Sequence, residues 1–449
     1  MKYYSDILRV MLSGAALTTM FSACTFEQED YFEESAAIRI QHVNNEIQQT
    51  LSAPSSENGW VIQYYVAGTD EMDFEGFNLF GKFYENGKVT LSSDHRYLRN
   101  GNAGKYTEYT SYYEMLSEEG PVLCFNTWND ILSVFVDPVS PSSAPGSLID
   151  DGEGMNGDDR LVVLSYSPDE VLLRGERHSA PIRFLRLDRS PEEYIVLTAV
   201  AKMVFAGGKI DEYRLTNGSA TRFISGISKG YFDYVDRLDD PLDKSVKSCV
   251  FTPSGFRTRD PFVVGNDTVQ EFVLDLENDL LLSGNVQMLP CWERFVNKQV
   301  SANGAVSITA DGSCDAFAAL YNKLATDIQT AFPTQTFDYI TFGKSSESGT
   351  KSRVGLVFYA STSRSKFLTG FSGSVTFDEE NATATISIDP NDPSDNFGNY
   401  SKKDIGSSFT DIVNAMNGTY SIQVNTKFGP TKATWTKVND PSFYFVTNF

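Results

Sequence analysis

The residue with the most specific chemistry is Cys24, at the end of an apolar N-terminal stretch. A basic start, an apolar core over residues 10–21 and the small residues Ser22 and Ala23 precede it, which is the layout of an export signal. A cysteine in this place is typical of a bacterial lipoprotein, in which the thiol is lipidated after cleavage. We therefore expect residues 1–23 to be a signal peptide and Cys24 to carry a lipid anchor, which is stable when it holds more than one acyl chain.

Residues 226–230 read Gly-Ile-Ser-Lys-Gly, the spelling of a nucleophile elbow that presents a reactive serine on a strained turn. In that fold the catalytic histidine follows the serine. The three histidines of this chain, His42, His95 and His178, all precede it, and no helical pattern comes after it. We interpret the motif as a glycine-rich turn.

Other catalytic signatures are missing from the sequence. It has no His-Glu-x-x-His motif, no paired cysteines at zinc spacing and no phosphate-binding loop. We therefore expect no cofactor and no enzymatic activity. An anchored glycoside hydrolase or peptidase stays open as the alternative, because paired carboxylates are recognised by their separation in space.

An acidic loop offers the candidate metal ligands. Carboxylate oxygens in a flexible loop suit a hard cation such as calcium, although the ligand order of an EF-hand is missing and a solvated acidic loop is the alternative. The candidates are Asp150, Asp151, Glu153, Asp158 and Asp159.

Aromatic side chains are the candidate binding residues. Tyr109, Tyr112 and Tyr113 lie in a polar segment, and Trp128 follows soon after. Flat rings of this kind can stack on a sugar or a peptide, although most aromatic residues in strands belong to the core. A weaker modification signal is Asp-Thr-Val around Thr268, which fits a short O-glycosylation pattern.

Four cysteines follow Cys24, an even number that is compatible with disulfides in an exported protein. Cys124 and Cys249 lie in strand-like runs and are expected as buried thiols. A disulfide between Cys291 and Cys314 is left open.

The net charge of −22 at pH 7 excludes one class of partner. Such an acidic chain repels phosphate backbones, so we expect no nucleic acid partner. No stretch after the leader reaches 18 consecutive apolar residues, so the lipid at Cys24 is the expected contact with a membrane.

Helices and strands alternate in a pattern that predicts an α+β fold. A helix is expected over residues 35–51, where Ile40, Val43, Ile47 and Leu51 recur at helical spacing. Strands at 77–84 and 88–91 are joined by Asn-Gly, which supplies the positive φ angles of a tight hairpin. Further helices are expected from the capping box at 190–193 to Gly207, and over 315–332. Other expected strands are 60–65, 122–125, 131–136, 161–166, 171–174, 182–187, 231–235, 248–251, 272–274, 355–359, 374–377 and 382–388.

The pattern is thus a helix followed by an antiparallel β-meander, in units dominated by strands. The chain is longer than one core usually organises, so two or three domains are expected. The Pro-, Ser-, Gly- and Asp-rich stretch 138–157 predicts a surface loop between strands of one sheet. Residues 76–91 and 370–388 are read as the same unit used twice. The expected segments are an acidic tether (24–30), an N-terminal α+β domain (31–188), a middle α+β unit (189–285) and a C-terminal α+β unit (286–449).

Several of these segments resemble a known family. They are Phe32-Glu-Glu-Ser-Ala-Ala-x-Arg39, Glu57-Asn-Gly-Trp60, Lys82-Phe-Tyr-Glu-Asn-Gly-Lys-Val89, Gly120-Pro-Val-Leu-x-Phe-Asn-Thr127, Asp137-Pro138, Gly157-Asp-Asp159, Glu170-Val-Leu-Leu-Arg-Gly175, Phe251-Thr-Pro-Ser-Gly-Phe256 and Pro261-Phe-x-Val-Gly265. Together they resemble the Bacteroidota lipoproteins catalogued as domain of unknown function 4302, over about residues 30–275. The sequence departs from the family pattern at Trp128 and Ser133-Val134.

The resemblance implies an accessory lipoprotein made alongside SusC-like TonB-dependent transporters and SusD-like binding proteins. It implies an outer-membrane, cell-surface location, because the acidic residues Glu27, Glu29 and Asp30 are similar to the signal that sends such lipoproteins outward. It supplies no catalytic residues. We therefore expect a non-enzymatic surface lipoprotein that helps to capture an oligosaccharide or peptide. A structural subunit of the transporter assembly is the further alternative.

Overall fold

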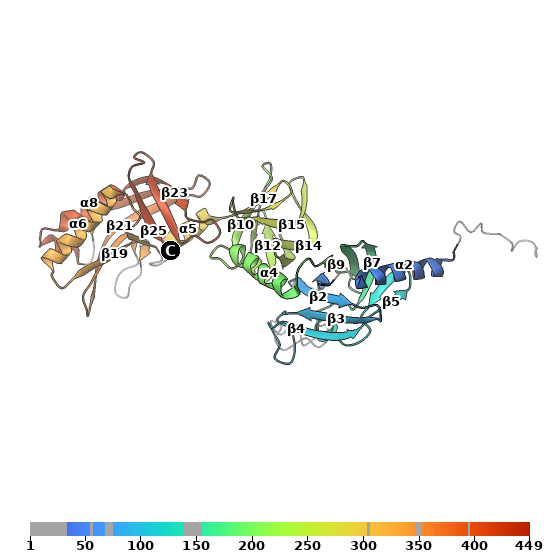
Figure 1. The fold of residues 1–449 in the computed structure, drawn as a ribbon. Helices are drawn as coiled ribbons and strands as arrows, with labels where there is room; N and C mark the ends of the chain where they lie inside the picture. Colours follow the sequence, from blue (N-terminus) through green and yellow to red (C-terminus); the bar gives the residue numbers. More distant parts are fainter. Residues whose placement is uncertain are drawn as a thin grey trace, which may run out of the picture.

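The computed structural model describes residues 34–53, 57–67, 75–138, 155–302, 306–345, 353–393 and 396–449. The expected signal peptide, Cys24 and the tether lie outside the described residues, as do Asp150, Asp151 and Glu153. Strands dominate what is described, and their pairings are antiparallel. The predicted α+β fold of helix-plus-meander units is therefore confirmed. Figure 1 shows three such units following one another along the chain.

The first unit is a curled sheet of nine strands in the order β4-β3-β2-β1-β9-β8-β7-β6-β5. Its two edge strands, β4 and β5, are consecutive in the chain, with Tyr113 alone between them. The strands are β1 (Trp60–Tyr64), β2 (Phe77–Phe83), β3 (Lys88–Ser93), β4 (Thr107–Tyr112), β5 (Glu114–Ser117), β6 (Pro121–Cys124), β7 (Arg160–Tyr166), β8 (Glu170–Gly175) and β9 (Pro181–Arg186). The meander is thus broken at one point, between β4 and β5.

Helix α2 (Ala36–Ser52) covers the first unit's core from the side of β5, β2 and β6. The prediction of an apolar helix face is confirmed for the C-terminal half of α2, where Ile47 and Leu51 are fully buried. The indole Nε1 of Trp60 donates to the Leu51 carbonyl at 3.0 Å, which ties the end of the helix to β1. Burial of each large apolar side chain contributes about 1.5–3 kcal/mol.

Two local predictions in this unit need correction. Residues 131–136 do not form a strand, because Ser133–Val136 is a short helix, α3. The Asn129 carbonyl accepts the N–H of Ser133 at 2.7 Å, which starts a helical turn, and a short apolar run does not show by periodicity whether it is strand or helix. In the hairpin after β2, Gly87 has a φ of 77° but Asn86 is not at positive φ, so one residue, not two, makes the unusual bend.

The second unit is a closed barrel of the consecutive strands β10 to β17. They are β10 (Glu212–Thr216), β11 (Thr221–Ser225), β12 (Tyr231–Val235), β13 (Lys244–Thr252), β14 (Gly255–Val264), β15 (Asp267–Asp275), β16 (Leu280–Ser283) and β17 (Val286–Pro290). Helix α4 (Pro191–Phe205) packs on β13 and β14. Its predicted N-cap is confirmed, because Ser190 Oγ accepts the N–H of Glu193 at 3.2 Å.

The expected boundary of the middle unit at residue 285 is wrong. Strand β17, which ends at Pro290, pairs with β10 and β16 and so closes this barrel.

The third unit is a second closed barrel, β18 to β25. Its strands are β18 (Ser307–Thr309), β19 (Thr336–Ser345), β20 (Arg353–Ser361), β21 (Lys366–Asp378), β22 (Thr383–Pro393), β23 (Gly418–Val424), β24 (Lys432–Lys437) and β25 (Tyr444–Asn448). Its helices are α5 (Trp292–Ser301), α6 (Asp315–Ala331), α7 (Phe397–Ser401) and α8 (Gly406–Met416). The two segments read as a repeat are the hairpins β2–β3 and β21–β22, in the first and third units. No helix among the described residues is long and apolar enough to span a membrane.

The second and third units exchange apolar side chains. Phe428, from the loop between β23 and β24, is buried in the core cluster of the second unit. Ile210, just before β10, is buried in the core cluster of the third. Each barrel therefore contributes a residue to the other's core, which restricts movement between them.

Candidate functional site

The four aromatic residues predicted to bind ligand do not form one surface. Tyr109, Tyr112 and Trp128 are 41%, 50% and 49% exposed. Tyr113 is buried, with its ring edge against Phe83 and its hydroxyl donating to the Tyr84 carbonyl at 3.1 Å. Tyr113 therefore supports the core and presents no ring face for stacking.

The three exposed residues, Tyr109, Tyr112 and Trp128, lie near the break in the sheet between the edge strands β4 and β5. The loop that follows β6 occupies this break. Thr127 Oγ1 accepts the N–H of Tyr112 at 2.9 Å. The fully buried Asn129 donates to the Tyr109 carbonyl at 3.2 Å and to Ser111 Oγ at 2.9 Å. Side chains thus satisfy part of the β4 edge that no neighbouring strand pairs.

Trp128 is carried on this loop and is already engaged. Its Nε1 donates to Asp130 Oδ1 at 2.6 Å. The guanidinium carbon of Arg99 lies 5.2 Å from the ring centroid, and Arg99 also pairs with Asp137 at 2.6 Å. Arg99 therefore occupies one face of the indole, which leaves at most the other face for a ligand.

A groove of about 360 Å³ runs over the outer face of β2, β3 and β4, next to the start of α4. Alternate residues of each strand point outward, and the register places Thr90 beside Lys82 and Thr110, and Ser92 beside Glu108. The lining is mostly polar: Glu57, Asn58, Lys82, Tyr84, Thr90, Ser92, Tyr106, Glu108, Thr110 and Glu192, with Phe80, Gly81 and Pro191. We call this surface the outer-face groove.

Hydrogen bonds fix the polar floor of the outer-face groove. The Tyr106 hydroxyl donates at 2.8 Å to Glu108 Oε1, and it lies 3.1 Å from Ser92 Oγ. Burial raises the pKa of Tyr106 to about 12, so the hydroxyl stays protonated at neutral pH. The hydroxyls of Thr90 and Thr110 are 2.9 Å apart. Hydroxyls and a carboxylate set beside tyrosine rings can hydrogen-bond and stack on a sugar.

Of the predicted aromatic residues, Tyr112 belongs to this face, two positions beyond Thr110 on β4. The sequence reading passed over Tyr84, Thr90 and Thr110. The hairpin register together with strand alternation is the signal that would have found them.

The acidic loop is only partly described. The buried carboxylate of Asp158 accepts the N–H groups of Arg177 at 3.0 Å and His178 at 3.2 Å, so it fixes the turn between β8 and β9. The carboxyl group of Asp159 has a raised pKa, caused chiefly by burial. No group of three or more possible ligands that could hold a metal occurs among the described residues.

The remaining candidates have structural surroundings. Gly226 and Gly230 flank a 3-10 turn between β11 and β12, both with positive φ, so the glycine-turn interpretation is confirmed. Cys124, Cys249, Cys291 and Cys314 are free thiols, and the disulfide left open between Cys291 and Cys314 is not formed. Cys314 instead caps α6, accepting the N–H of Phe317 at 3.4 Å. Thr268 lies on β15 with its side chain exposed, so a glycan attached there would not disturb the core.

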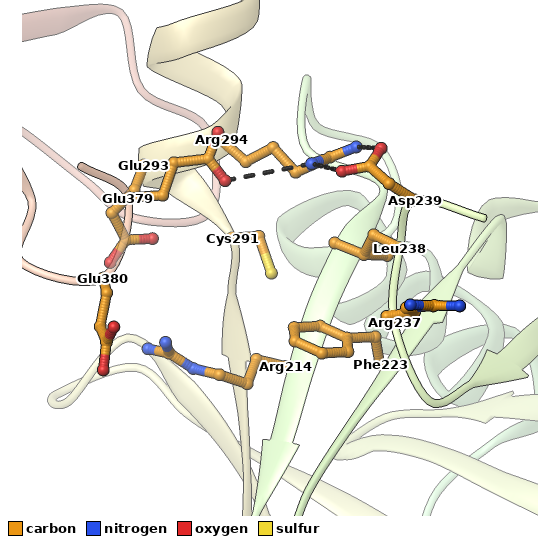
Figure 2. A pocket seen from close by; sticks show the side chains of 10 residues that line it. All are labelled: Arg214, Phe223, Arg237, Leu238, Asp239, Cys291, Glu293, Arg294, Glu379 and Glu380. Atoms are coloured by element: carbon orange, nitrogen blue, oxygen red, sulfur yellow. Dashed lines mark hydrogen bonds and ion pairs between the residues drawn. The ribbon is translucent and has the colours of Figure 1, made fainter. Parts of the chain in front are cut away.

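A second cavity, of about 380 Å³, lies where the second and third units meet. Figure 2 shows carboxylates and Arg214 on one side of it and the Phe223 ring and Leu238 on the other. It is lined by Arg214, Phe223, Arg237, Leu238, Asp239, Cys291, Glu293, Arg294, Glu379 and Glu380. We call it the inter-barrel pocket. Sequence reasoning did not find it, because its residues come from both barrels and α5.

Comparison with known proteins gives one family. Residues 28–276 match the family described as "Domain of unknown function (DUF4302)", and no curated protein matches the chain. Among solved structures, the C. crescentus β sliding clamp aligns at 9% identity over 91% of this chain and 96% of its own, with a TM-score of 0.12. The β subunit of DNA polymerase III from Pseudomonas aeruginosa aligns at 8% identity over 91% and 97%, with a TM-score of 0.11.

Proposed function

The chain belongs to the DUF4302 family, and from that premise we propose that it is a cell-surface lipoprotein of the outer membrane that captures an oligosaccharide for a SusC/SusD-like TonB-dependent importer. The capture is non-enzymatic. The anchor is Cys24, and the acidic residues behind it direct the protein to the outer leaflet.

The outer-face groove carries the proposal for the ligand. It combines a mostly uncharged hydrogen-bonding floor with the exposed ring of Tyr84 and with Tyr106. Neutral hydroxyls match sugar hydroxyls as both donors and acceptors. A peptide is the second ligand class, and the charged groups Lys82, Glu57, Glu108 and Glu192 at the groove allow for it.

Membrane anchoring allows a binding site of modest affinity to be effective. A protein held on a membrane beside a transporter raises the local concentration of its cargo, so a modest affinity suffices. The strong negative charge keeps such a surface protein soluble and apart from anionic head groups.

Titration calorimetry of the full mature protein in detergent with a panel of neutral oligosaccharides and peptides tests the ligand. We expect a neutral glycan to bind, and Tyr84→Ala to weaken it by ~1 kcal/mol, about fivefold in Kd. Trp128→Ala serves as the matched control, since it removes an exposed ring of the same unit outside the groove. Loss of binding in the control alone would move the site to the β4 edge.

Two further measurements separate the alternatives. Sugar or peptide products without retained ligand would favour an anchored hydrolase, and co-purification with the transporter without ligand binding would favour a structural subunit. Protease treatment of whole cells should degrade the protein, and Cys24→Ala should release it from the membrane fraction. A protein that survives while a known surface control is cut is not on the cell surface.

A further inference from the structure

The inter-barrel pocket brings together three parts of the chain. The second barrel contributes Arg214 on β10, Phe223 on β11 and Leu238, α5 contributes Glu293, and the turn between β21 and β22 contributes Glu380. Phe428 and Ile210, each buried in the core of the other barrel, join the two barrels whose residues line this pocket.

Two of its three arginines are already committed. Arg294 bonds both oxygens of Asp239, reaches Glu212 at 3.1 Å and lies 4.0 Å from Glu379. Arg237 donates to the Asp240 carbonyl at 2.7 Å, and its guanidinium points away from the centre of the pocket (Figure 2). These contacts hold the pocket together and leave little capacity for a ligand.

Arg214 is different. It is half-buried on the outer side of β10, and its guanidinium extends into the pocket on the side of Glu380 (Figure 2). Within the part of the chain that the structure describes, no ion pair or side-chain hydrogen bond holds Arg214, although its charge acts on nearby Glu293 and on the Cys291 thiol. A guanidinium holds five N–H donors in a planar fork that matches a carboxylate.

Two carboxylates near Arg214 are also available to bind a ligand cation. Glu293 and Glu380 make no ion pair among the described residues, whereas Glu379 accepts from Asn297 Nδ2 at 2.7 Å. Burial raises the pKa of Glu293, and the positive charges of Arg214 and Lys427 act against this effect without cancelling it. An ammonium group placed there would be favoured.

We propose that the inter-barrel pocket binds a small zwitterion, a free α-amino acid or dipeptide with an apolar side chain. Arg214 takes the carboxylate, Glu293 and Glu380 take the ammonium group, and the side chain lies against Phe223 and Leu238. The charged groups of an α-amino acid are neighbours on its α-carbon and would face Arg214 and the glutamates on one side of the pocket, while its side chain would face Phe223 and Leu238 on the other (Figure 2). A volume of about 380 Å³ admits a ligand of this size.

This site is separate from the outer-face groove, and either proposal can fail without the other. In the inter-barrel pocket, part of the ligand's contacts comes from the third unit. That unit lies beyond residue 276, where the family match ends. A bound zwitterion would also bridge the two barrels.

Titration calorimetry of the full mature protein with L-leucine and L-leucyl-L-alanine tests the proposal. We expect saturable binding, with affinity lowered at least ~tenfold when L-leucinamide or N-acetyl-L-leucine replaces the amino acid, because each lacks one charge. Arg214→Gln should lower affinity for L-leucine by a similar factor. Arg259→Gln, a barrel arginine paired with Asp260 outside the pocket, should leave affinity and melting temperature unchanged.

Three results with these ligands would each overturn the proposal. They are no heat with either zwitterion, equal binding of leucinamide and leucine, or unchanged affinity in Arg214→Gln when its circular dichroism matches the parent. Binding of a glycan that Arg214→Gln abolishes would assign the pocket to a different ligand class and would also contradict it.

Discussion

The side-chain amide of Asn78 donates a hydrogen bond of 2.8 Å to the backbone carbonyl of Phe251, which joins β2 of the first unit to β13 of the second. Two residues earlier, the Gly76 N–H donates to the Cys249 carbonyl at 2.9 Å, and Tyr65 donates its hydroxyl to the Arg257 carbonyl at 2.8 Å. These bonds join the first two units, and the family match covers the first unit and most of the second. The match stops at residue 276, before β16 and β17 complete the second barrel.

The interlock between the barrels can be tested at Phe428. Its ring is 3% exposed in the core cluster of the second unit, although the residue belongs to the third. We expect Phe428→Ala to lower the free energy of unfolding by about 3 kcal/mol, the usual cost of deleting a buried ring, measured by urea denaturation. Val438→Ala, at a half-exposed position of the same unit, should change it by less than ~0.5 kcal/mol. A small effect in Phe428→Ala would mean that the joint is loose in solution.

The loop that fills the break in the first sheet depends on Asn129. Besides its bonds to Tyr109 and Ser111, its Oδ1 accepts the N–H of Ile131 at 3.0 Å. Removing the three hydrogen bonds of this buried side chain should cost about 2–4 kcal/mol, so Asn129→Ala should shift the urea midpoint strongly. Asn45→Ala on the exposed side of α2 is the control. Equal stability of the two variants would show that water replaces the Asn129 amide.

His95 should make stability depend on pH. Burial among Phe77 and Phe135 lowers the pKa of His95 to about 4, while its Nε2 donates to the Ile131 carbonyl at 2.9 Å. The unfolded chain takes up this proton at pH near 6.5, so stability from His95 is present above that pH and is lost as pH falls toward 4.

The test of His95 is the variant His95→Gln, which keeps a donor for Ile131 and does not titrate. Between pH 7 and pH 4.5 the parent should lose about 2–3 kcal/mol more than the variant, measured by denaturation at both values. Parallel pH profiles of the two proteins would show that the folded ring takes up its proton at the same pH as the unfolded chain.

Gly343 is required where α5 packs on β19. Its φ is 108°, and a Cβ there would lie 1.8 Å from the carbonyl oxygen of Val300 in α5. Gly343→Ala should therefore destabilise by about 3 kcal/mol or more, seen as a lower melting temperature. Gly398→Ala in α7, where nothing lies within 4 Å of the added methyl, should be neutral or slightly stabilising. Normal stability of Gly343→Ala would mean that α5 shifts away at little cost.

Local signals in the sequence determined much of the secondary structure. Ser190 and Pro191 determine where α4 begins, and the spacing of apolar residues predicts helices α2 and α6. The alternation of apolar and polar residues predicts most strands of the first sheet. These features depend on hydrogen bonds and periodicities within a few residues, so they are readable without the fold. The family, the strand-rich class and the turn at Gly226 also followed from the sequence.

Tertiary structure alone decided how the strands close and which side chains meet. The pairing of β10 with β17 moved the second unit's end to Pro290, and the helix at Ser133 depends on Asn129 bonding to a distant strand. Arg214 and Glu380 are far apart in sequence, and they share a pocket because a turn of one barrel rests beside a strand of the other. The sequence determined the local elements because their causes are local. The candidate binding surfaces depend on long-range pairing and on packing between barrels, which no short segment encodes.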